Sequence, residues 1–271
     1  MDRSPLHRDV TRLKVVHRQR VNRQGDAEPP PTTAPKVTPV TAENAARGWQ
    51  GLLDTEYESI VIASWMTAAM SRLGAPLDLI GAFGRVVEDE IRHVDVCAEM
   101  VERFGGSPTL VRGPLPPLPT SLERGTEPEL ETVCGLVGFF CVFELLSGYV
   151  FYEALERCGD DLPRWAVGEI YRDEAFHGAF GFEAARFFVA DWSEAWRTRL
   201  ARHAEAEVQR FARRLEPGAR LGAAGEVAAL ENLGLLSPSR ILPVFHTGVE
   251  KELIPRLKEL GIPVEIQIVA S

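Results

Sequence analysis

The sequence predicts an all-α protein: a four-helix bundle with additional C-terminal helices and an extended basic N-terminal arm. Two observations lead to this fold class. Four long segments carry apolar residues at helical spacing, and glycine or proline signals separate them. Shorter helical segments follow, near 192–215, 220–233 and 238–260. The bundle helices are expected at about 44–73, 76–104 and 127–158, with a fourth that starts within 159–163 and continues to about 190.

Composition divides the chain into three parts. Residues 1–44 form a basic, proline-rich arm whose composition favours extended or disordered chain. Residues 45–190 hold the bundle, and residues 191–271 form a helical extension that is expected to pack on it. Between the second and third helices, the proline-rich stretch 107–126 predicts an extended polyproline connection. Long crossovers of this kind occur in some helix bundles.

Charge and cysteine content disfavour several classes of protein. Residues 1–24 carry a net charge of +5 and the rest of the chain −14, for a total of −9. Because phosphate binding needs a basic surface, we expect no nucleic-acid partner. No uninterrupted apolar run reaches the length of a membrane span, so we expect no membrane partner either. The four cysteines form no C-x-x-C pair, which predicts reduced thiols and a cytoplasmic protein.

The clearest chemical motif is a Glu-x-x-His pair that occurs twice, at Glu90 and His93 and at Glu174 and His177. Residues three apart share one helix face, so each pair can aim a carboxylate and an imidazole at one point. One such pair is a weak signal. Both copies, however, are preceded by aspartate and align when the chain is shifted by 84 residues. This repeat predicts two similar helix pairs with one equivalent site in each half.

Each pair has a further glutamate about 30 residues upstream on an apolar helix. Glu144 stands between a phenylalanine-rich run and two leucines, which leaves no solvated face for its charge. Coordination of a cation would offset the cost of burying this carboxylate, and a buried salt bridge is the alternative. On the first helix we expect Glu58, because Ile62 and Trp65 continue its face, and Glu56 is the alternative.

Together these residues predict a site for two metal ions. An oxygen-rich ligand set without thiolates favours iron or manganese over zinc and copper, and two divalent ions balance four carboxylates. The expected cofactor is a pair of iron ions, with manganese–iron or manganese–manganese as alternatives. The expected ligands are Glu58, Glu90, His93, Glu144, Glu174 and His177.

This pattern resembles the ferritin-like di-iron carboxylate superfamily over residues 50–190, since that superfamily carries Glu, Glu-x-x-His, Glu and Glu-x-x-His on four helices. The stretch Asp-Glu-Ile-Arg-His around the first pair is similar to the signature of bacterial multicomponent monooxygenases. The resemblance implies that Asp89, Arg92 and Asp173 orient the opposite histidines. The second copy departs from the signature, because Phe176 stands where arginine is expected.

The resemblance also implies a function. We expect an oxidoreductase, a di-iron oxidase or oxygenase that activates dioxygen to oxidise a small organic substrate with an external electron donor. Ser147, one turn after Glu144, is a candidate proton relay, and Tyr171, one turn before Glu174, is a candidate redox neighbour. The aromatic residues around Glu144 fit either a substrate pocket or ordinary core packing.

Three other functions stay open at this point. The first is ferroxidase or iron-handling activity, although the basic arm and the C-terminal extension exceed what a minimal ferritin subunit needs. The second is peroxide chemistry of the rubrerythrin or manganese-catalase type, which would need a separate electron carrier because no rubredoxin-like cysteine pairs are present. The third is a helical interaction module without metal, which six intact ligand positions disfavour. A homodimer is compatible with each of them.

Overall fold

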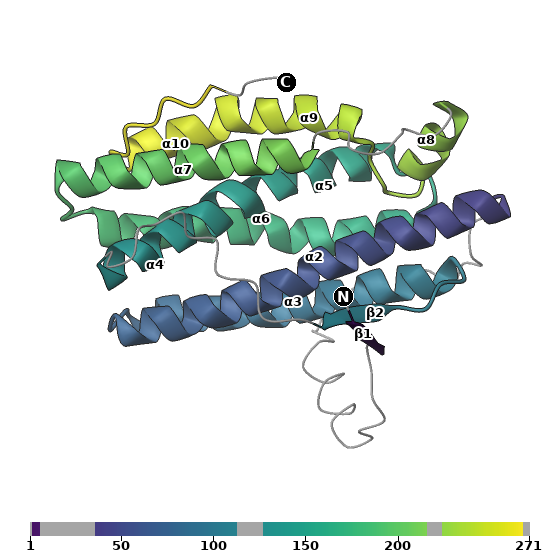
Figure 1. Ribbon diagram of the computed structural model, residues 1–271, viewed down its shortest axis with the longest axis horizontal. Helices are drawn as coiled ribbons and strands as arrows, with labels where there is room; N and C mark the ends of the chain where they lie inside the picture. Colours follow the sequence, from purple (N-terminus) through teal and green to yellow (C-terminus); the bar gives the residue numbers. More distant parts are fainter. Residues whose placement is uncertain (1, 6–35, 113–126, 216–223, 268–271) are drawn as a thin grey trace, which may run out of the picture.

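The computed structural model describes residues 2–5, 36–112, 127–215 and 224–267. Within these ranges the protein is all-α apart from one short strand pair, which confirms the predicted class. Two long helix pairs lie against each other, and a further layer of helices covers the second pair on the side away from the first (Figure 1).

The first pair consists of α2 (Pro39–Arg72) and α3 (Leu77–Arg103), which pack extensively on each other. α2 begins earlier than the sequence predicts. Its start is fixed by Thr38, whose side chain accepts a hydrogen bond from the Thr41 backbone N–H, and a proline occupies the first turn. The turn between the helices contains Gly74, whose φ of +69° lies in the left-handed region that favours glycine.

The second pair is built from one long helical run and α6 (Asp161–Val189). The run comprises α4 (Pro128–Leu136), the π-helical segment η1 (Val137–Glu144) and α5 (Leu145–Arg157). The sequence predicts one regular helix here, and the wider π-turn is a finding of the structure. By length and composition this run could cross a membrane, and 72% of its most apolar window is buried inside the protein. Its apolar side chains are therefore used mainly in internal packing.

The C-terminal helices form the outer layer (Figure 1). α7 (Glu194–Leu215) contacts α4 and η1. α9 (Pro238–Gly248) contacts α5 and α7, and continues through the π-helical η2 (Val249–Leu253) into α10 (Ile254–Glu259). The short α8 (Ala224–Glu231) contacts α2 instead. The extension thus touches both helix pairs.

A short antiparallel strand pair lies beside α2. It joins β1 (Asp2–Pro5) to β2 (Thr109–Arg112), and the sequence does not predict it. The remainder of the predicted arm through residue 35 and the proline-rich residues 113–126 lie outside the described residues. At the other end of the chain, residues 264–267 form neither helix nor strand.

The buried apolar residues form two clusters that divide each long helix at the same level. On α2, Leu53 belongs to one cluster and Ile62 to the other. On α3, Val94 and Val86 are divided in the same way. The interval between the clusters is filled by buried polar side chains, which is unusual for a helical core and indicates a site.

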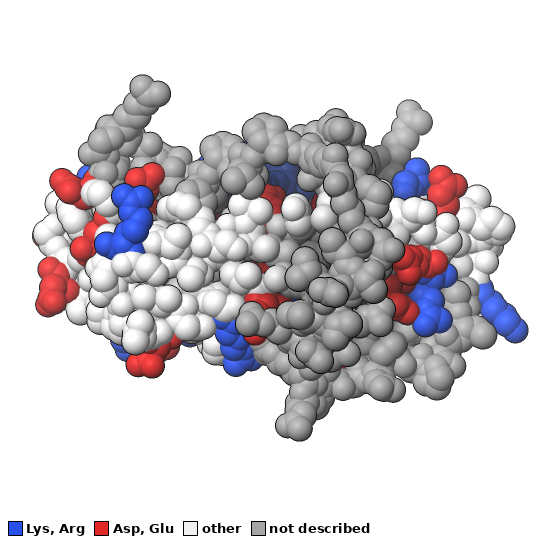
Figure 2. Space-filling model, turned by 90° about the horizontal axis from the view of Figure 1, so that it is seen from below, with Lys and Arg blue, Asp and Glu red and all other residues white. Residues whose placement is uncertain are grey.

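Charged side chains are scattered over the described surface. Seen from below (Figure 2), isolated acidic and basic residues surround a broad stretch without charge. Several surface ion pairs join residues one turn apart, such as Arg103 and Glu99, whose Nε and Oε1 are 2.8 Å apart. Exposed pairs of this kind contribute little to stability. The described part of this face carries no continuous patch of one sign.

Candidate metal centre

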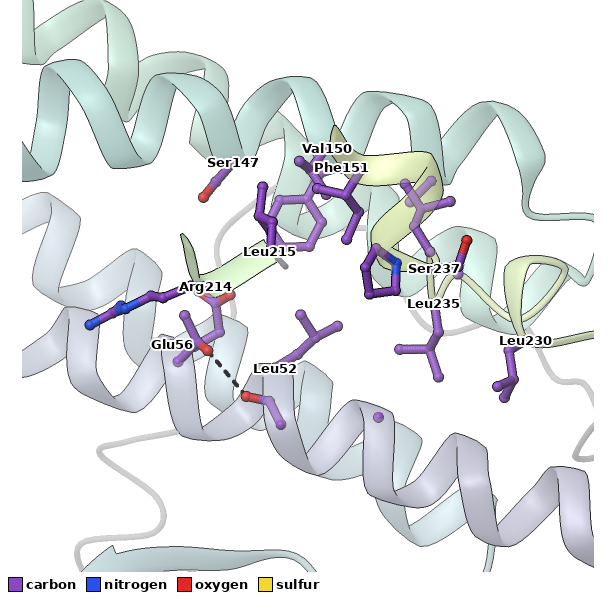
Figure 3. A pocket seen from close by; sticks show the side chains of 18 of the residues that line it. Leu52, Glu56, Ser147, Val150, Phe151, Arg214, Leu215, Leu230, Leu235 and Ser237 are labelled. Carbon is purple, nitrogen blue, oxygen red and sulfur yellow. Dashed lines mark hydrogen bonds between the residues drawn. The ribbon is translucent and has the colours of Figure 1, made fainter. Parts of the chain in front are cut away.

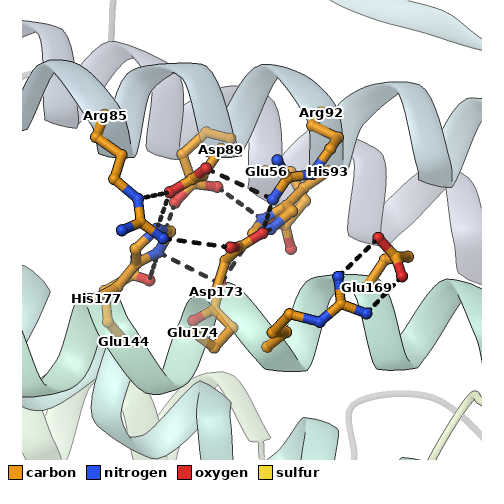
Figure 4. A network of polar contacts seen from close by, with 12 residues as sticks. Glu56, Arg85, Asp89, Arg92, His93, Glu144, Glu169, Asp173, Glu174 and His177 are labelled. Carbon is orange, nitrogen blue, oxygen red and sulfur yellow. Dashed lines mark hydrogen bonds and ion pairs between the residues drawn. The ribbon is translucent and has the colours of Figure 1, made fainter. Parts of the chain in front are cut away.

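Four helical segments each direct a carboxylate into the interval between the two apolar clusters (Figure 4). Two histidines join them, and no member of this central cluster is more than 4% exposed. The members are Glu56 on α2, Glu90 and His93 on α3, Glu144 at the end of η1, and Glu174 and His177 on α6. Helices that are far apart in the sequence therefore converge on one buried point.

The potential ligand atoms form two overlapping groups, and within each group they lie within 4.8 Å of one another. The groups are Glu56, Glu90, His93 and Glu174, and Glu90, Glu144, Glu174 and His177. The Glu90 carboxylate spans both, because one oxygen is 3.3 Å from His93 Nδ1 and the other is 3.3 Å from His177 Nδ1. Oε1 of Glu174 is 3.8 Å and 3.9 Å from the same two nitrogens. The geometry offers two positions that share two carboxylates.

The structure corrects one predicted ligand: Glu56, and not Glu58, faces the central cluster. Oε2 of Glu56 is 3.3 Å from His93 Nδ1. The inward face of α2 runs through buried Leu53, Glu56 and Ser59 at a spacing of three residues. Glu58 lies about 200° around the helix from Glu56, since each residue advances about 100°. It is only half-buried and belongs to neither ligand group.

Each histidine is held from behind by an aspartate of the opposite helix. His93 Nε2 on α3 lies 3.3 Å from Asp173 Oδ2 on α6, and His177 Nε2 on α6 lies 3.4 Å from Asp89 Oδ2 on α3. If Nε2 donates to the aspartate, the lone pair of Nδ1 faces the central cluster, as a metal-ligating imidazole requires. The structure thus brings Asp89 and Asp173 to the positions that the sequence predicts.

Two arginines bind these aspartates, and the sequence analysis identified only one of them. Arg92 contacts Asp173 and, at 3.5 Å, Asp89. Arg85 Nε lies 3.3 Å from Asp89 Oδ2, and its guanidinium stacks 4.1 Å above the Phe176 ring. Phe176 stands in the second motif at the position that Arg92 takes in the first. Arg85 supplies a cation there instead, and its guanidinium packs on the Phe176 ring. The available signal was the position of Arg85, one helical turn before Asp89.

Burial and mutual contacts strongly shift the pKa values of the side chains in the central cluster. Burial raises the pKa of Glu56 to about 7 and that of Glu174 well above its usual range. Burial alone would also raise the pKa of Glu90, but contacts with His177 and His93 outweigh it and hold that pKa well below its usual range. Burial opposes the charged form of His93, yet Glu56 and Glu90 raise its pKa to about 9. Without a cation the cluster therefore retains protons, which metal binding would displace.

The residues fit divalent cations better than they fit a purely structural salt bridge. Four buried carboxyl groups face two imidazoles, so without a metal ion some of the carboxyl groups must hold protons. Oε2 of Glu174 is buried and has no hydrogen-bond partner among the described residues, and the two buried oxygens of Glu90 have histidine contacts at 3.3 Å that do not have hydrogen-bond geometry. Orphaned buried oxygens of this kind are costly, and two divalent ions would satisfy them.

The remaining predicted site residues lie at different distances from this chemistry. Ser147 lines a cavity of about 580 Å³ together with three of the cluster carboxylates. Phe143 and Phe151 line the same cavity, and both also pack in the apolar clusters. Tyr171 is half-buried and does not line the cavity, and its ring centroid lies 5.6 Å from that of the exposed Tyr152.

Comparison with known proteins does not add to this picture. A scan against protein-family models gives no match, and a comparison with curated proteins gives none. The function is therefore inferred from the geometry and chemistry of the central cluster.

Proposed function

We propose that this chain is a ferritin-like four-helix-bundle protein that binds two iron ions, or manganese in place of one or both, and activates dioxygen to oxidise a small organic molecule. One observation carries the proposal: two buried groups, each with three carboxylates and one histidine, share Glu90 and Glu174. When bound, a pair of such ions supplies two-electron redox chemistry that protein side chains alone cannot provide.

The donor set supports iron or manganese. Each group offers carboxylate oxygens and one imidazole nitrogen, and neither includes a cysteine of the described chain. Cys97 lies close enough to feel the charges of Glu56 and Glu90, but burial, reinforced by those charges, raises the pKa of its thiol well above the usual range. A protonated thiol is a poor ligand, so the cluster stays an oxygen-rich site.

The protein's own residues would orient the ligands, admit the substrate and move protons. Asp89 and Asp173 fix both imidazoles, which keeps Nδ1 directed at the cluster. The cavity reaches three cluster carboxylates and gives an organic molecule access to them. The Ser147 hydroxyl on its wall can pass a proton to or from the reacting molecule. A mainly apolar cavity favours this reaction over ferroxidase or peroxide chemistry, whose small polar substrates need no such space.

The proposal is tested by loading the full chain with ferrous iron without oxygen and then measuring dioxygen consumption. We expect the wild-type protein and the control variant Glu58→Gln to consume dioxygen, and Glu56→Gln to be about tenfold slower or more, because only Glu56 faces the cluster. Absence of consumption in the loaded wild-type protein would overturn the proposal. Ferric mineral that grows in proportion to added iron would replace it with iron handling.

A further inference from the structure

The cavity beside the central cluster has the size of a small-molecule site. Its volume is about 580 Å³, within the roughly 300–1,000 Å³ typical of ligand pockets. Glu56, Glu144 and Glu174 form part of its wall, so a molecule inside it would meet the proposed ions directly. Glu90 and both histidines do not line it. The cavity thus approaches the cluster from one side only.

The walls of the cavity carry charged side chains at one side and mainly apolar side chains at the other. α2, α5, α7 and the segment from α8 to α9 all contribute to them. Figure 3 shows Ser147, Glu56 and Arg214 toward one side, and Leu230, Leu235 and Ser237 toward the opposite side. A molecule that fills the cavity therefore needs an apolar body and at least one polar group.

Specific contacts fix the apolar wall to α2, so the cavity is preformed. The Trp49 indole N–H donates to the Leu233 carbonyl at 3.3 Å, and Asn44 donates to the Glu226 carboxylate. Leu235 packs so closely on α2 that a Cβ at Gly48 would lie 2.6 Å from its Cδ1. A preformed pocket binds its ligand without first ordering its own wall.

Arg214 is the one basic side chain among the described residues that line the cavity. It is exposed and forms no hydrogen bond or ion pair with a described residue, although the charge of Glu207 acts on it at longer range. Arg210, one turn earlier, differs because its Nη1 lies 3.2 Å from Glu207. The acidic residues of the lining all belong to the central cluster. The Arg214 guanidinium is thus available to an anion that enters from solution.

We propose that the cavity binds a small molecule with an apolar body and one anionic group. The anionic group pairs with Arg214, and the apolar body lies against Phe151, Leu230 and Leu235. That this molecule is the substrate rests on the proposed oxidase function. The binding preference itself rests on the cavity and on Arg214.

Two fluorescent probes with the same apolar body test this preference. 8-Anilinonaphthalene-1-sulfonate carries an anionic sulfonate, and N-phenyl-1-naphthylamine lacks it. We expect Arg214→Gln to weaken sulfonate-probe binding by about threefold to tenfold, as for a partly exposed ion pair, and to leave the neutral probe within twofold. The control Arg213→Gln changes the neighbouring exposed arginine, which does not line the cavity, and leaves both affinities unchanged. Equal effects on the two probes, or equal effects of the two variants, would overturn the proposal.

A second pair of variants tests the location. A Cβ at Gly51 meets no atom within 4 Å, and Gly51 lines the cavity, so Gly51→Phe should narrow it and weaken both probes at least fivefold. Gly81 on α3 is equally open but lies away from the cavity, and Gly81→Phe should change neither. Unchanged binding in Gly51→Phe would place the probes elsewhere and overturn the assignment. Titrations with and without manganese separate the two proposals. If the Arg214 variant affects only the sulfonate probe but the protein binds no metal, only the proposed oxidase function is refuted. If the protein binds metal but the variant affects both probes equally, only the proposed anionic ligand is refuted.

Discussion

The substitution Gly181→Ala tests how the structure positions Glu144. A Cβ at this point of α6 would lie 2.6 Å from the Phe140 Cβ and 2.9 Å from the Phe140 carbonyl carbon on η1. Ordinary carbon contacts are about 3.5–4.0 Å, so the two segments must separate by about 1 Å. A side-chain rotation cannot relieve the backbone contact. Overpacking costs about 1–3 kcal/mol, and alanine stabilises a helix by about 1 kcal/mol relative to glycine, which leaves a net loss of up to about 2 kcal/mol.

Urea unfolding of the metal-free protein measures this loss, and manganese titration measures its effect on the site. Glu144 Oε2 lies 3.2 Å from His177 Nδ1, so a shift of η1 should also weaken metal binding by about tenfold. Gly84→Ala on α3 is the control, since its Cβ would meet nothing within 4 Å. It should stabilise the protein by about 0.5–1 kcal/mol and leave metal binding unchanged. If Gly181→Ala is as stable as Gly84→Ala, the close approach of η1 and α6 does not hold the ligand in place.

Two further predictions concern side chains outside the ligand set. Arg85→Gln should weaken manganese binding by about threefold to tenfold, because the Arg85 guanidinium holds the aspartates behind the histidines. The control Arg186→Gln changes an exposed ion pair on α6 and should leave manganese binding unchanged, so equal affinities of the two variants in equilibrium titrations would contradict this role of Arg85. Burial lowers the pKa of His203 from 6.5 to about 4, so between these pH values the unfolded chain binds a proton that the folded chain does not. The stability that depends on neutral His203 is complete above pH 6.5 and falls by about 3 kcal/mol as the pH drops to 4. His203→Gln should flatten this loss in urea unfolding at pH 7 and 4.5, and an unchanged slope would assign the loss to groups that both proteins retain, including Glu207 and Arg210.

Local spacing explains why most of the central cluster could be predicted from the sequence. Glu90 with His93 and Glu174 with His177 are each three residues apart, and the helical repeat alone places each pair on one face. Glu144 was identifiable because apolar residues surround it on the chain. The same reasoning failed on α2, where Glu56 and Glu58 both stand next to Tyr57 and no apolar run surrounds either of them. Only contact with α3 decides which of them faces inward.

The features that the sequence did not predict depend on contacts between distant segments. Arg85 binds Asp89 on the same helix, but its contact with the Phe176 ring joins residues of the two helix pairs. The π-turn in η1 accompanies close packing on Gly181 of α6, and nothing in the apolar run itself distinguishes it from a regular helix. The cavity likewise combines α2 and α5 with the segment that includes Leu235.

Electron paramagnetic resonance of the manganese-loaded full chain tests the central claim most directly. Two ions that share the carboxylates of Glu90 and Glu174 should bind in a ratio of two per chain and give the spectrum of a spin-coupled pair. One ion per chain, no binding, or two magnetically independent ions would contradict a shared site.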